Sequence, residues 1–389
     1  MKLALVLLSV LLSIVVNPAL SAEQQPVDSP QAFLVTYAPG ALYYERFGHN
    51  AIWLKNPATG VDHIFNFGFF DFNQPNFLSR FLRGDTLYFS AARKPEIEFA
   101  EYRVAGRSIS LQKLNLDSAQ LWKLERHLIA QIQPGSRDYR YEYFRNNCST
   151  RIRDALDLVL QDELKQSLIG QPSNYTLREQ IHIAAEADPW LYLGMDLAMG
   201  PSLDRPQSQW QAAFIPAVLS TAVESVHGLV AERTVYYQGQ AAVVRHQPLW
   251  YLFIVGTAIA LLFVLLVRPW RQQGCNRSCR ILAFTWLGLC SLVGMFLLWL
   301  WLATSHVDAA GNWNILLLNP LYLPAILYLR NKPAGMFWLA MQILVSTLLA
   351  ALGGWWNNQV MFAPLMFLTP IMLVVMAFLW RARNADTAI

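Results

Sequence analysis

Cys148 is the residue best suited to chemistry in this sequence, because its setting favours the reactive form of a thiol. It stands directly before a helical pattern whose apolar stripe includes Ile152 and Leu156, and Asn147 is a good N-cap residue. The sulfur is therefore expected at the positive end of a helix, where the dipole and the free amide groups favour the thiolate. The same amides are suited to hold an oxyanion on an attacked carbonyl. The alternative is a small buried hydrophobe, since many free cysteines are inert in a core.

The position of Cys148 in the chain also favours reactivity, because it is the one cysteine of the part expected outside the cytoplasm. Exported domains usually pair their thiols or omit them, since the compartment is oxidising. An unpaired thiol there is a liability unless its chemistry is needed. The remaining cysteines fall in or beside a membrane-spanning region: Cys275, Cys279 and Cys290.

A thiol nucleophile needs a general base, and His49 is the candidate. It follows Phe47-Gly48, where the backbone can turn sharply, and it opens a predicted strand over 49–54. A side chain at a strand end can face a helix N-terminus, although a structural histidine at such a position is common. The other histidines of the exported part have less informative surroundings: His63, His127, His182 and His227.

Hairpin geometry predicts a third member, Asn66, that orients the base. Two predicted strands flank a turn rich in turn-forming residues. If Leu54 faces Val61 across this turn, then His49 faces Asn66 on the same side of the sheet. A register shifted by one residue would send Asn66 to the other face. The alternatives for the third member are His63 and Asp62.

The composition and the spacing of ligand-type residues weigh against other kinds of site. The chain has 389 residues, of which 54% are hydrophobic and 14% charged, with the apolar excess at the C-terminal end. The net charge of +4 is small and its basic residues are scattered, so nucleic acid is not an expected partner. No H-x-x-x-H or C-x-x-C spacing occurs, and the closely spaced Cys275 and Cys279 have no partner pair, so neither a metal nor a cofactor is expected.

The N-terminus is typical of a secretory signal peptide, predicted over residues 1–22. Met1-Lys2 supplies the positive start, residues 3–16 are the apolar core, and small residues precede the expected cleavage site. The apolar core is short for a membrane span, and an uncleaved anchor is the alternative. Residues 23–247 then form the exported domain, expected in the periplasm of a Gram-negative cell, although a Gram-positive surface fits the charge pattern equally well.

Residues 248–389 are predicted to form a bundle of five transmembrane helices. Each apolar stretch approaches the roughly 20 residues that a bilayer requires, but the third is short and contains Pro320 and Pro324. The predicted spans are 249–267, 281–302, 315–329, 334–352 and 360–380.

Loop charges set the orientation of this bundle. Arginines and lysines follow the first, third and last spans, whereas the loops at about 303–314 and 353–359 contain none. Basic loops stay in the cytoplasm, so the C-terminus is expected there and the segment before the first span outside. The signal peptide agrees with this orientation, which predicts a multi-pass inner-membrane protein with a periplasmic N-terminal domain.

The exported domain mixes strand and helix patterns, which predicts an α+β fold. Residues 32–38 and 108–116 have the composition and alternation of strands. Asp117 with Gln120 resembles a capping box that opens a helix reaching about Ile132.

Three runs of residues resemble the Lnb N-terminal periplasmic domain family. They are residues 47–52 around His49, residues 66–72 with Pro75-Asn76-Phe77, and residues 143–154 around Cys148. The loop after the second predicted span also resembles that family. It carries Ser305-His306, Asn312-Trp313-Asn314 and Leu318-Asn319-Pro320. The resemblance spans nearly the whole mature chain.

The resemblance implies a lipoprotein N-acyltransferase of the bacterial inner membrane, which adds a third acyl chain to the α-amine of a lipidated N-terminal cysteine. The order of histidine and then cysteine is also similar to permuted NlpC-type and lecithin:retinol acyltransferase-type thiol enzymes, which implies a papain-like domain. By this resemblance Cys148 is the nucleophile and His49 the base, whereas Asn66 as the orienting residue is inferred from the hairpin. The implied partners are a phospholipid acyl donor, a lipoprotein acceptor and the membrane.

Four further residues are predicted to bind substrate. His306 and Asn312 lie in a loop on the same side of the membrane as the domain, where lipid head groups are expected. Asn147 and Arg151 lie beside Cys148 and complete the predicted set.

Two other functions remain as alternatives. A cell-wall peptidase or amidase of the NlpC type would use the same pair of Cys148 and His49, but five membrane helices would be hard to justify in such an enzyme. A non-enzymatic membrane assembly protein would simply bury Cys148.

Overall fold

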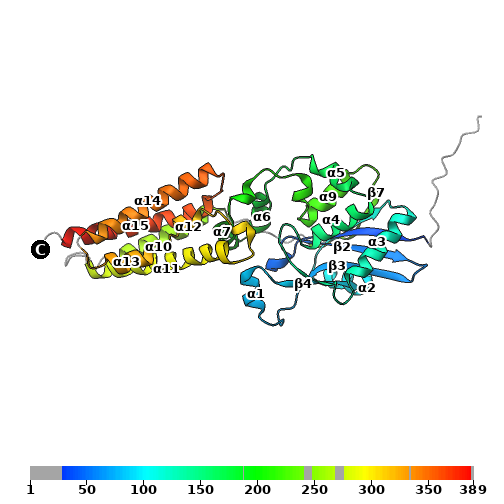
Figure 1. Ribbon diagram of the computed structural model, residues 1–389, viewed down its shortest axis with the longest axis horizontal. Coiled ribbons are helices and arrows are strands. Elements are labelled where there is room, and N and C mark those ends of the chain that lie inside the picture. Colours follow the sequence, from blue (N-terminus) through cyan, green and yellow to red (C-terminus); the bar gives the residue numbers. More distant parts are fainter. Residues whose placement is uncertain (1–28, 187, 241–247, 268–275, 333, 387–389) are drawn as a thin grey trace, which may run out of the picture.

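The computed structural model describes residues 29–386 apart from 187, 241–247, 268–275 and 333. It shows an α+β domain that continues end to end into a bundle of helices (Figure 1). The α+β class predicted for the exported domain is confirmed. The predicted signal peptide, 1–22, lies outside the described residues.

A seven-stranded antiparallel sheet is the frame of the domain, with the order β6-β4-β3-β2-β1-β5-β7. The first four strands are neighbours in both sequence and space, as short connections favour. The next strand pairs with the free edge of the first. The bounds are β1 Gln31–Tyr37, β2 His49–Asn56, β3 Val61–Phe69, β4 Leu87–Arg93, β5 Ile109–Leu114, β6 Asp138–Arg140 and β7 Val230–Tyr237.

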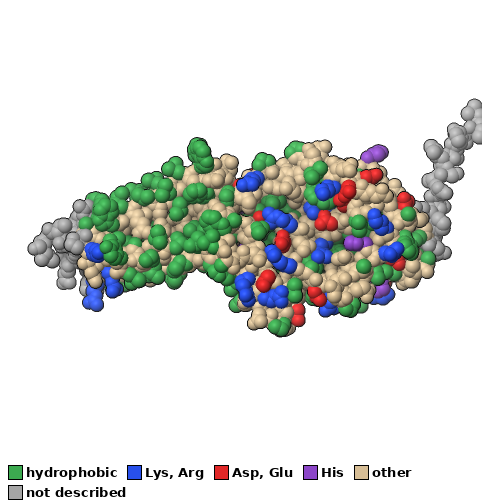
Figure 2. Space-filling model, viewed as in Figure 1, with side chains coloured by type: hydrophobic (Ala, Val, Ile, Leu, Met, Phe, Trp, Pro, Cys, Tyr) green, Lys and Arg blue, Asp and Glu red, His purple; other side chains and the backbone are tan. Residues whose placement is uncertain are grey.

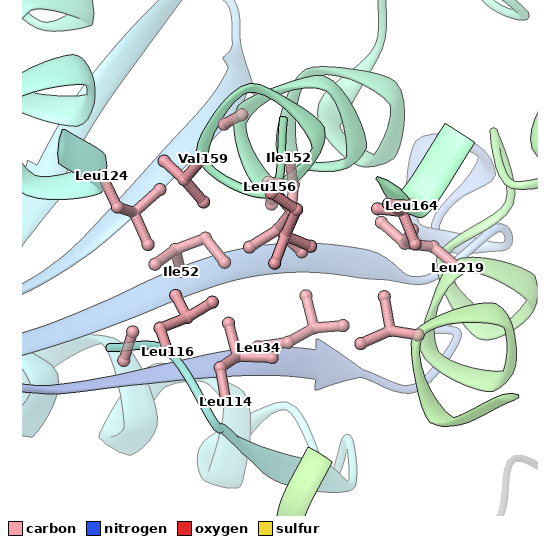
Figure 3. Close-up of a cluster of buried hydrophobic side chains, with 14 of the residues drawn as sticks. Leu34, Ile52, Leu114, Leu116, Leu124, Ile152, Leu156, Val159, Leu164 and Leu219 are labelled. Carbon is pink, nitrogen blue, oxygen red and sulfur yellow. The ribbon is translucent and has the colours of Figure 1, made fainter. Parts of the chain in front are cut away.

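One face of the sheet is covered by α4 (Cys148–Val159). Because side chains alternate along a strand, Leu34 of β1 and Ile52 of β2 point to this face. They pack against Ile152 and Leu156 of α4 in the main core of the domain (Figure 3). These helix residues are the apolar stripe predicted from the sequence, so burial of that stripe fixes where the N-terminus of α4 lies.

The opposite face of the sheet packs on α2 (Pro95–Val104). Val35 and Ile64 belong to a second core that includes Phe99 of this helix. Pro95 occupies the first turn of α2, where its missing N–H costs no hydrogen bond.

The remaining helices of the domain range from 4 residues, in α8, to 14 residues, in α3. α3 opens with the predicted capping box, in which Asp117 Oδ1 accepts from Gln120 N at 2.8 Å and Gln120 Oε1 accepts from Asp117 N at 2.9 Å. Their bounds are α1 Phe77–Arg83, α3 Ser118–Gln131, α5 Glu163–Ile169, α6 Leu177–Ala185, α7 Pro189–Ala198, α8 Gln209–Ala212 and α9 Pro216–Ser225.

In the described residues the C-terminal part has four helices that are long and apolar enough to cross a membrane. The third predicted span corresponds to a shorter apolar stretch, Asn314–Leu329, so a bundle of five membrane-crossing helices stays a prediction. The four long helices correspond to the first, second, fourth and fifth predicted spans. They are α10 Trp250–Val267, α11 Asn276–Ala303, α14 Gly335–Trp356 and α15 Phe362–Asp386.

The third predicted span, 315–329, is split into α12 (Asn314–Leu317) and α13 (Tyr322–Leu329). Pro320 lies in the break and has no N–H to continue a helix. The exposed backbone groups are satisfied by Ser291 of α11, whose Oγ donates to Pro320 O at 2.6 Å and accepts from Leu323 N at 3.2 Å. A neighbouring helix thus makes the break tolerable in an apolar setting.

The domain and the bundle are joined by direct hydrogen bonds. Ser305, just after α11, donates its N–H to Arg83 O at 2.8 Å. Arg145 forms a bidentate ion pair with Asp308, with both contacts at 2.8 Å. Hydrophobic side chains cover the bundle, whereas charged side chains gather over the domain and its junction with the bundle, with further Lys and Arg side chains at the far end of the bundle (Figure 2).

Candidate active site

The candidate site lies where the N-terminus of α4 meets the start of β2. Because α4 packs on β2 and β3, its first residue, Cys148, comes close to His49, the first residue of β2. Asn147 caps the helix as predicted, since its Oδ1 accepts from Thr150 N at 2.9 Å. Cys148 has a free thiol and is only partly buried.

The pKa values of Cys148 and His49 shift in opposite directions. Burial by itself raises the pKa of the Cys148 thiol, but the charge and hydrogen bond of His49 outweigh burial and lower it. The Asn50 backbone N–H, which donates to the sulfur, lowers the same pKa. Burial lowers the pKa of His49, but the charge and hydrogen bond of Cys148, with help from Asn66, raise it overall. These shifts favour a thiolate beside an imidazolium.

Asn66 holds the other side of the His49 ring. His49 Nε2 lies 2.8 Å from Asn66 Oδ1. The predicted register is wrong by two residues, because Val61 pairs with Asn56 and not with Leu54. The turn is shorter than expected, so Asn66 lies opposite Ala51. A shift of two residues preserves the face of the sheet, which leaves Asn66 as a diagonal neighbour of His49.

The two alternatives for this position point elsewhere. His63 pairs with Leu54, and alternation along β3 sends its side chain to the face opposite Asn66. Asp62 shares the face of Asn66, but its Oδ1 accepts a hydrogen bond from the Trp53 indole N–H at 2.8 Å.

A buried carboxylate extends the network beyond Asn66. Asn66 Nδ2 donates to Glu98 Oε2 at 2.7 Å, and the Tyr37 hydroxyl donates to Glu98 Oε1 at 2.5 Å. Glu98 is 1% exposed. Burial raises the pKa of Glu98 above its ordinary value, although the hydrogen bonds from Tyr37 and Asn66 work against that shift.

Glu98 determines which atom of Asn66 faces the histidine. The Asn66 amide nitrogen lies between two acceptors, Glu98 Oε2 at 2.7 Å and the backbone oxygen of Ile64 at 3.3 Å. The amide oxygen is therefore turned toward His49 Nε2, which must carry the hydrogen. In the neutral ring His49 Nδ1 is then the basic nitrogen, and it is available to take the proton of Cys148.

A second buried chain of hydrogen bonds holds the backbone that faces the sulfur. Ser149 Oγ donates to Asn50 Oδ1 at 2.9 Å, and Asn50 Nδ2 donates to Thr36 Oγ1 at 2.8 Å. Ser149 and Asn50 are both fully buried. This chain connects α4 with β2 and β1 and keeps the Asn50 N–H beside Cys148.

Gly68 leaves space next to the thiol. Its φ is +96°, a backbone conformation that favours glycine, and it lies at a register shift between β3 and β4. A Cβ at this position would lie 3.7 Å from Cys148 Cβ and 3.8 Å from Tyr141 Cε2. The glycine backbone therefore comes close to the nucleophile without filling the space in front of it.

Asn147 and Arg151, two of the predicted substrate-binding residues, are engaged within the domain. Besides its capping role, Asn147 donates through Nδ2 to Tyr143 O and Phe214 O, each at 2.8 Å. Arg151 donates to Asn146 Oδ1 and Gln131 Oε1, each at 2.9 Å. The structure gives both side chains a structural role, and their contact with substrate stays a prediction.

His306 and Asn312, the other two, join the bundle to the domain. His306 Nε2 lies 3.1 Å from the backbone oxygen of Phe81 in α1. Asn312 is buried, donates to Leu197 O in α7 at 2.7 Å and accepts from Gln359 Nε2 at 2.9 Å. They lie on the domain side of the bundle, as expected, but these contacts are internal.

Glu98 and Tyr37 were not predicted from the sequence. A signal for Glu98 was present, because it lies at helical spacing with Pro95, Phe99 and Tyr102 on the apolar side of α2. A carboxylate on a buried face requires hydrogen-bond partners. Tyr37 had no such signal; it lies directly opposite His49 in the pairing of β1 with β2.

The arrangement combines a thiol nucleophile, a base, a residue that orients the base and an N–H group aimed at the sulfur. These parts suit acyl transfer or hydrolysis through a thioester. In the part of the chain that the structure describes, no group of three or more His, Cys, Asp or Glu side chains is placed to hold a metal ion.

Protein-family models match both the N-terminal and the C-terminal part of the chain. A family model described as the Lnb N-terminal periplasmic domain matches residues 18–181, and one described as the Lnb transmembrane domain matches residues 243–385. No curated protein and no solved structure matches the chain, so the papain-like architecture expected for the domain stays a prediction. The two matches follow each other in the order of a periplasmic domain and a membrane-spanning region, and the chain therefore belongs to the Lnb family.

Proposed function

We propose that this protein is a thiol acyltransferase that moves an acyl chain from a membrane phospholipid, through a thioester on Cys148, to the N-terminal amine of a lipoprotein. The observation that carries the proposal is the pairing of Cys148 with His49 at a helix N-terminus, in a domain joined to helices that can cross a membrane. Membership of the Lnb family supports it.

The first half of the reaction forms the thioester. The proton of Cys148 passes to His49 Nδ1, and the thiolate attacks the carbonyl carbon of the phospholipid ester. The oxyanion is held by N–H groups at the start of α4 and by the Asn50 N–H, which already points to this region. Collapse breaks the ester C–O bond, His49 returns its proton to the alkoxide, and a lysophospholipid leaves.

The second half consumes the thioester. The lipoprotein amine attacks the thioester carbonyl and transfers a proton to His49. Collapse breaks the C–S bond, releases the amide product and restores the thiolate beside the protonated imidazole. Asn66 keeps Nε2 protonated in both halves, so the same nitrogen of His49 exchanges the proton each time.

The decisive experiment detects the covalent intermediate. Purified full-length protein in phospholipid vesicles is digested and analysed by mass spectrometry for a hydroxylamine-labile acyl group on Cys148. Addition of a peptide with a diacylglyceryl N-terminal cysteine is expected to discharge the group and to give the triacylated peptide. Cys148→Ala is expected to lose both signals, while Cys290→Ala, a matched change at a buried cysteine of the bundle, keeps them. A Cys148 that stays unacylated in phospholipid vesicles rejects the proposal.

The alternatives give different results with the same protein. A cell-wall peptidase or amidase would release fragments from purified peptidoglycan and would leave phospholipid intact. A non-enzymatic assembly protein would keep its role in cells after Cys148→Ala.

A further inference from the structure

A cluster of aromatic side chains extends from the end of β3 through α1. Phe70 contacts Phe72 and Tyr44 with ring centroids 4.7 and 5.6 Å apart, and Phe77 contacts Phe72 at 5.2 Å. We call Phe70, Phe72, Phe77, Leu78 and Phe81 the aromatic surface. Phe72 is 62% exposed and Leu78 is 67% exposed. Contiguous exposed apolar side chains of this kind mark a binding surface.

The position of the aromatic surface identifies a lipid layer as its partner. α1 is attached to the end of α11, a helix long enough to cross a membrane, because Arg83 O accepts from Ser305 N at 2.8 Å. Phe81 O is contacted by His306 Nε2 at 3.1 Å. Ser305 and His306 directly follow the last turn of α11, which ends at Ala303. The aromatic surface therefore lies level with the outer end of the bundle (Figure 1), where exposed Phe and Leu side chains can enter the boundary of a lipid layer.

Basic side chains on the same helix fit the head groups of such a layer. Arg80 and Arg83 belong to α1, and neither forms an ion pair with any residue that the structure describes. Arg80 donates to Asp85 O at 2.9 Å and Arg83 donates to Ser79 Oγ at 2.7 Å, so both are held on the helix. Their charges attract lipid phosphates while Leu78 and Phe81 enter the acyl layer.

A continuous row of rings connects the aromatic surface with the nucleophile. Phe70 contacts Tyr88 with centroids 5.2 Å apart, and Tyr88 stacks on Tyr141 at 4.1 Å. Tyr141 and Cys148 flank the space at Gly68, where a Cβ would lie within 3.8 Å of Tyr141 and 3.7 Å of Cys148. These contacts lead from the aromatic surface to the space beside Cys148.

We propose that the aromatic surface binds the acyl chain of an outer-leaflet phospholipid and leads it along Tyr88 and Tyr141 to Cys148. The delivery step rests on the proposed acyl transfer, whereas the docking of lipid does not. The ligand class is a glycerophospholipid with long acyl chains, because the rings offer apolar contact and the arginines offer contact to phosphate.

Photo-cross-linking tests the docking of lipid independently of catalysis. Full-length protein with Cys148→Ala is placed in vesicles that contain a phospholipid with a diazirine in one acyl chain, and cross-linked peptides are mapped by mass spectrometry. Cross-links are expected on the peptide that contains residues 69–81, in addition to those on the membrane helices. Cross-links confined to the membrane helices would overturn the proposal.

A pair of matched double variants tests delivery. Phe72→Ser with Leu78→Ser is expected to lower the rate of Cys148 acylation from vesicle phospholipid by about 10-fold or more, because serine offers the acyl chain far less apolar area. Trp122→Ser with Val104→Ser changes two side chains that are 56% and 91% exposed, in helices α3 and α2 away from the bundle, and is expected to leave the rate unchanged. Thermal midpoints in detergent establish that both variants are folded.

The two readouts separate the failure of this proposal from the failure of the proposed function. Equal acylation rates for both double variants, without cross-links at residues 69–81, reject the aromatic surface as a lipid site. Absence of acylation in the unsubstituted protein rejects the acyltransferase, while cross-links at 69–81 that disappear in Phe72→Ser with Leu78→Ser would still establish lipid docking.

Discussion

Two buried polar networks in this protein are each built around a histidine, but they differ in what faces the ring. In the candidate site, His49 lies between Asn66 and the thiol of Cys148. At the junction with the bundle, His182 of α6 lies between Asp196, at 2.7 Å from Nε2, and the Tyr192 hydroxyl, at 2.8 Å from Nδ1. Both ring nitrogens of His182 form hydrogen bonds with structural partners, whereas one ring nitrogen of His49 faces the thiol nucleophile.

The two networks also differ in the groups that contact their buried carboxylates. Asp196 is paired with the fully buried Arg178 at 3.0 Å, and Arg178 also forms two contacts with Asp204, at 2.7 and 3.0 Å. Glu98 has no ion pair among the described residues and relies on hydrogen bonds from Tyr37 and Asn66. The structural network pairs its charge with a countercharge. The site leaves its carboxylate only hydrogen bonded. Burial raises the pKa of Glu98, and it also raises the pKa of Asp204 in the junction network, so the two networks differ in charge pairing and not in the direction of this shift.

The difference teaches how a reactive network is recognised. Charge pairing holds α6, α7 and the loop after α7 together, and Asp196 O also accepts from Asn314 Nδ2 of the bundle at 2.8 Å. That network therefore fixes the domain on the bundle. The network of His49 instead ends at a partly accessible sulfur beside an open glycine, so its hydrogen bonds serve to set a tautomer and a pKa.

Replacing each histidine in turn gives the largest expected contrast. His49→Ala is expected to lower acyl transfer by about 10²–10⁴-fold, the range for loss of a positioned base. It also raises the pKa of Cys148, because the charge and hydrogen bond that lower it are removed while burial remains. The pH at which iodoacetamide alkylates Cys148 is therefore expected to move upward. Alkylation measured against pH by mass spectrometry checks this.

His182→Ala is the matched control for that substitution. It removes a histidine with the same number of ring hydrogen bonds and is expected to leave the alkylation profile of Cys148 unchanged, at a temperature where the variant is folded. Identical profiles for the two variants would show that His49 does not act on the thiol.

Replacing Arg178, the countercharge at the junction, tests how much the junction network contributes to stability. Arg178→Met leaves Asp196 and Asp204 buried without their cation, and a loss of about 3–5 kcal/mol in stability is expected. Arg126→Met, at an arginine of α3 that stacks on the exposed Trp122, is expected to change stability by less than about 0.5 kcal/mol. Thermal unfolding in detergent measures both. Similar midpoints for the two variants would mean that the junction network contributes no more than a surface contact.

The sequence was sufficient for the parts of the site that depend on periodicity. The position of Cys148 at the N-terminus of α4 follows from the cap at Asn147 and the apolar stripe behind it. Asn66 was placed on the correct face of the sheet despite a wrong register, because an error of two residues preserves alternation. The length of the hairpin turn could not be fixed, since several turns fit the same residues.

The rest of the site depends on contacts between elements distant in sequence. Glu98 reaches Asn66 only because α2 covers the opposite face of the sheet, and no local pattern determines that packing. The break in the third predicted span was signalled by Pro320, but its satisfaction by Ser291 requires the fold of α11 against it. The roles predicted for Asn147 and Arg151 rested on their proximity to Cys148, and proximity did not reveal that their polar atoms were already engaged.

Glu98→Gln tests whether the uncompensated carboxylate sets the tautomer. Glutamine presents a donor as well as an acceptor, so the Asn66 amide can reverse and offer its nitrogen to His49 Nε2. His49 would then carry its hydrogen on Nδ1 and lose the basic nitrogen that faces Cys148. A fall in acylation rate of about 10–100-fold is expected, as for loss of other residues that hold a reacting group. Glu101→Gln, on the exposed side of the same helix, is the control and is expected to retain the rate.

The same substitution changes how stability depends on pH. Because burial raises the pKa of Glu98, the folded state holds the proton more tightly than the unfolded state. Its contribution to stability is present at low pH and is lost as the pH rises above about 4.5 toward the raised value. Glu98→Gln is expected to remove this loss, so the difference in thermal midpoint between variant and parent shifts in favour of the variant as the pH increases. A difference in thermal midpoint that stays constant across this pH range would show that burial does not raise the pKa of Glu98.

Ser149→Ala is expected to have the smallest effect, and it separates the two functions of the second hydrogen-bond chain. The change leaves Asn50 Oδ1 buried without its donor, which costs about 1–3 kcal/mol of stability. It also loosens the chain that holds the Asn50 N–H, a donor that lowers the pKa of Cys148, so alkylation at a fixed pH below that pKa is expected to slow by a few-fold. Ser225→Ala, whose hydroxyl donates to Ala222 O within its own helix, is the matched control with an effect below about 0.5 kcal/mol. If Ser149→Ala lowers stability but leaves alkylation unchanged, the chain only supports the fold. If both change, the chain also positions the Asn50 N–H that the thiolate uses. The site then contains two buried networks that act on Cys148, one through the His49 imidazole and one through the Asn50 backbone.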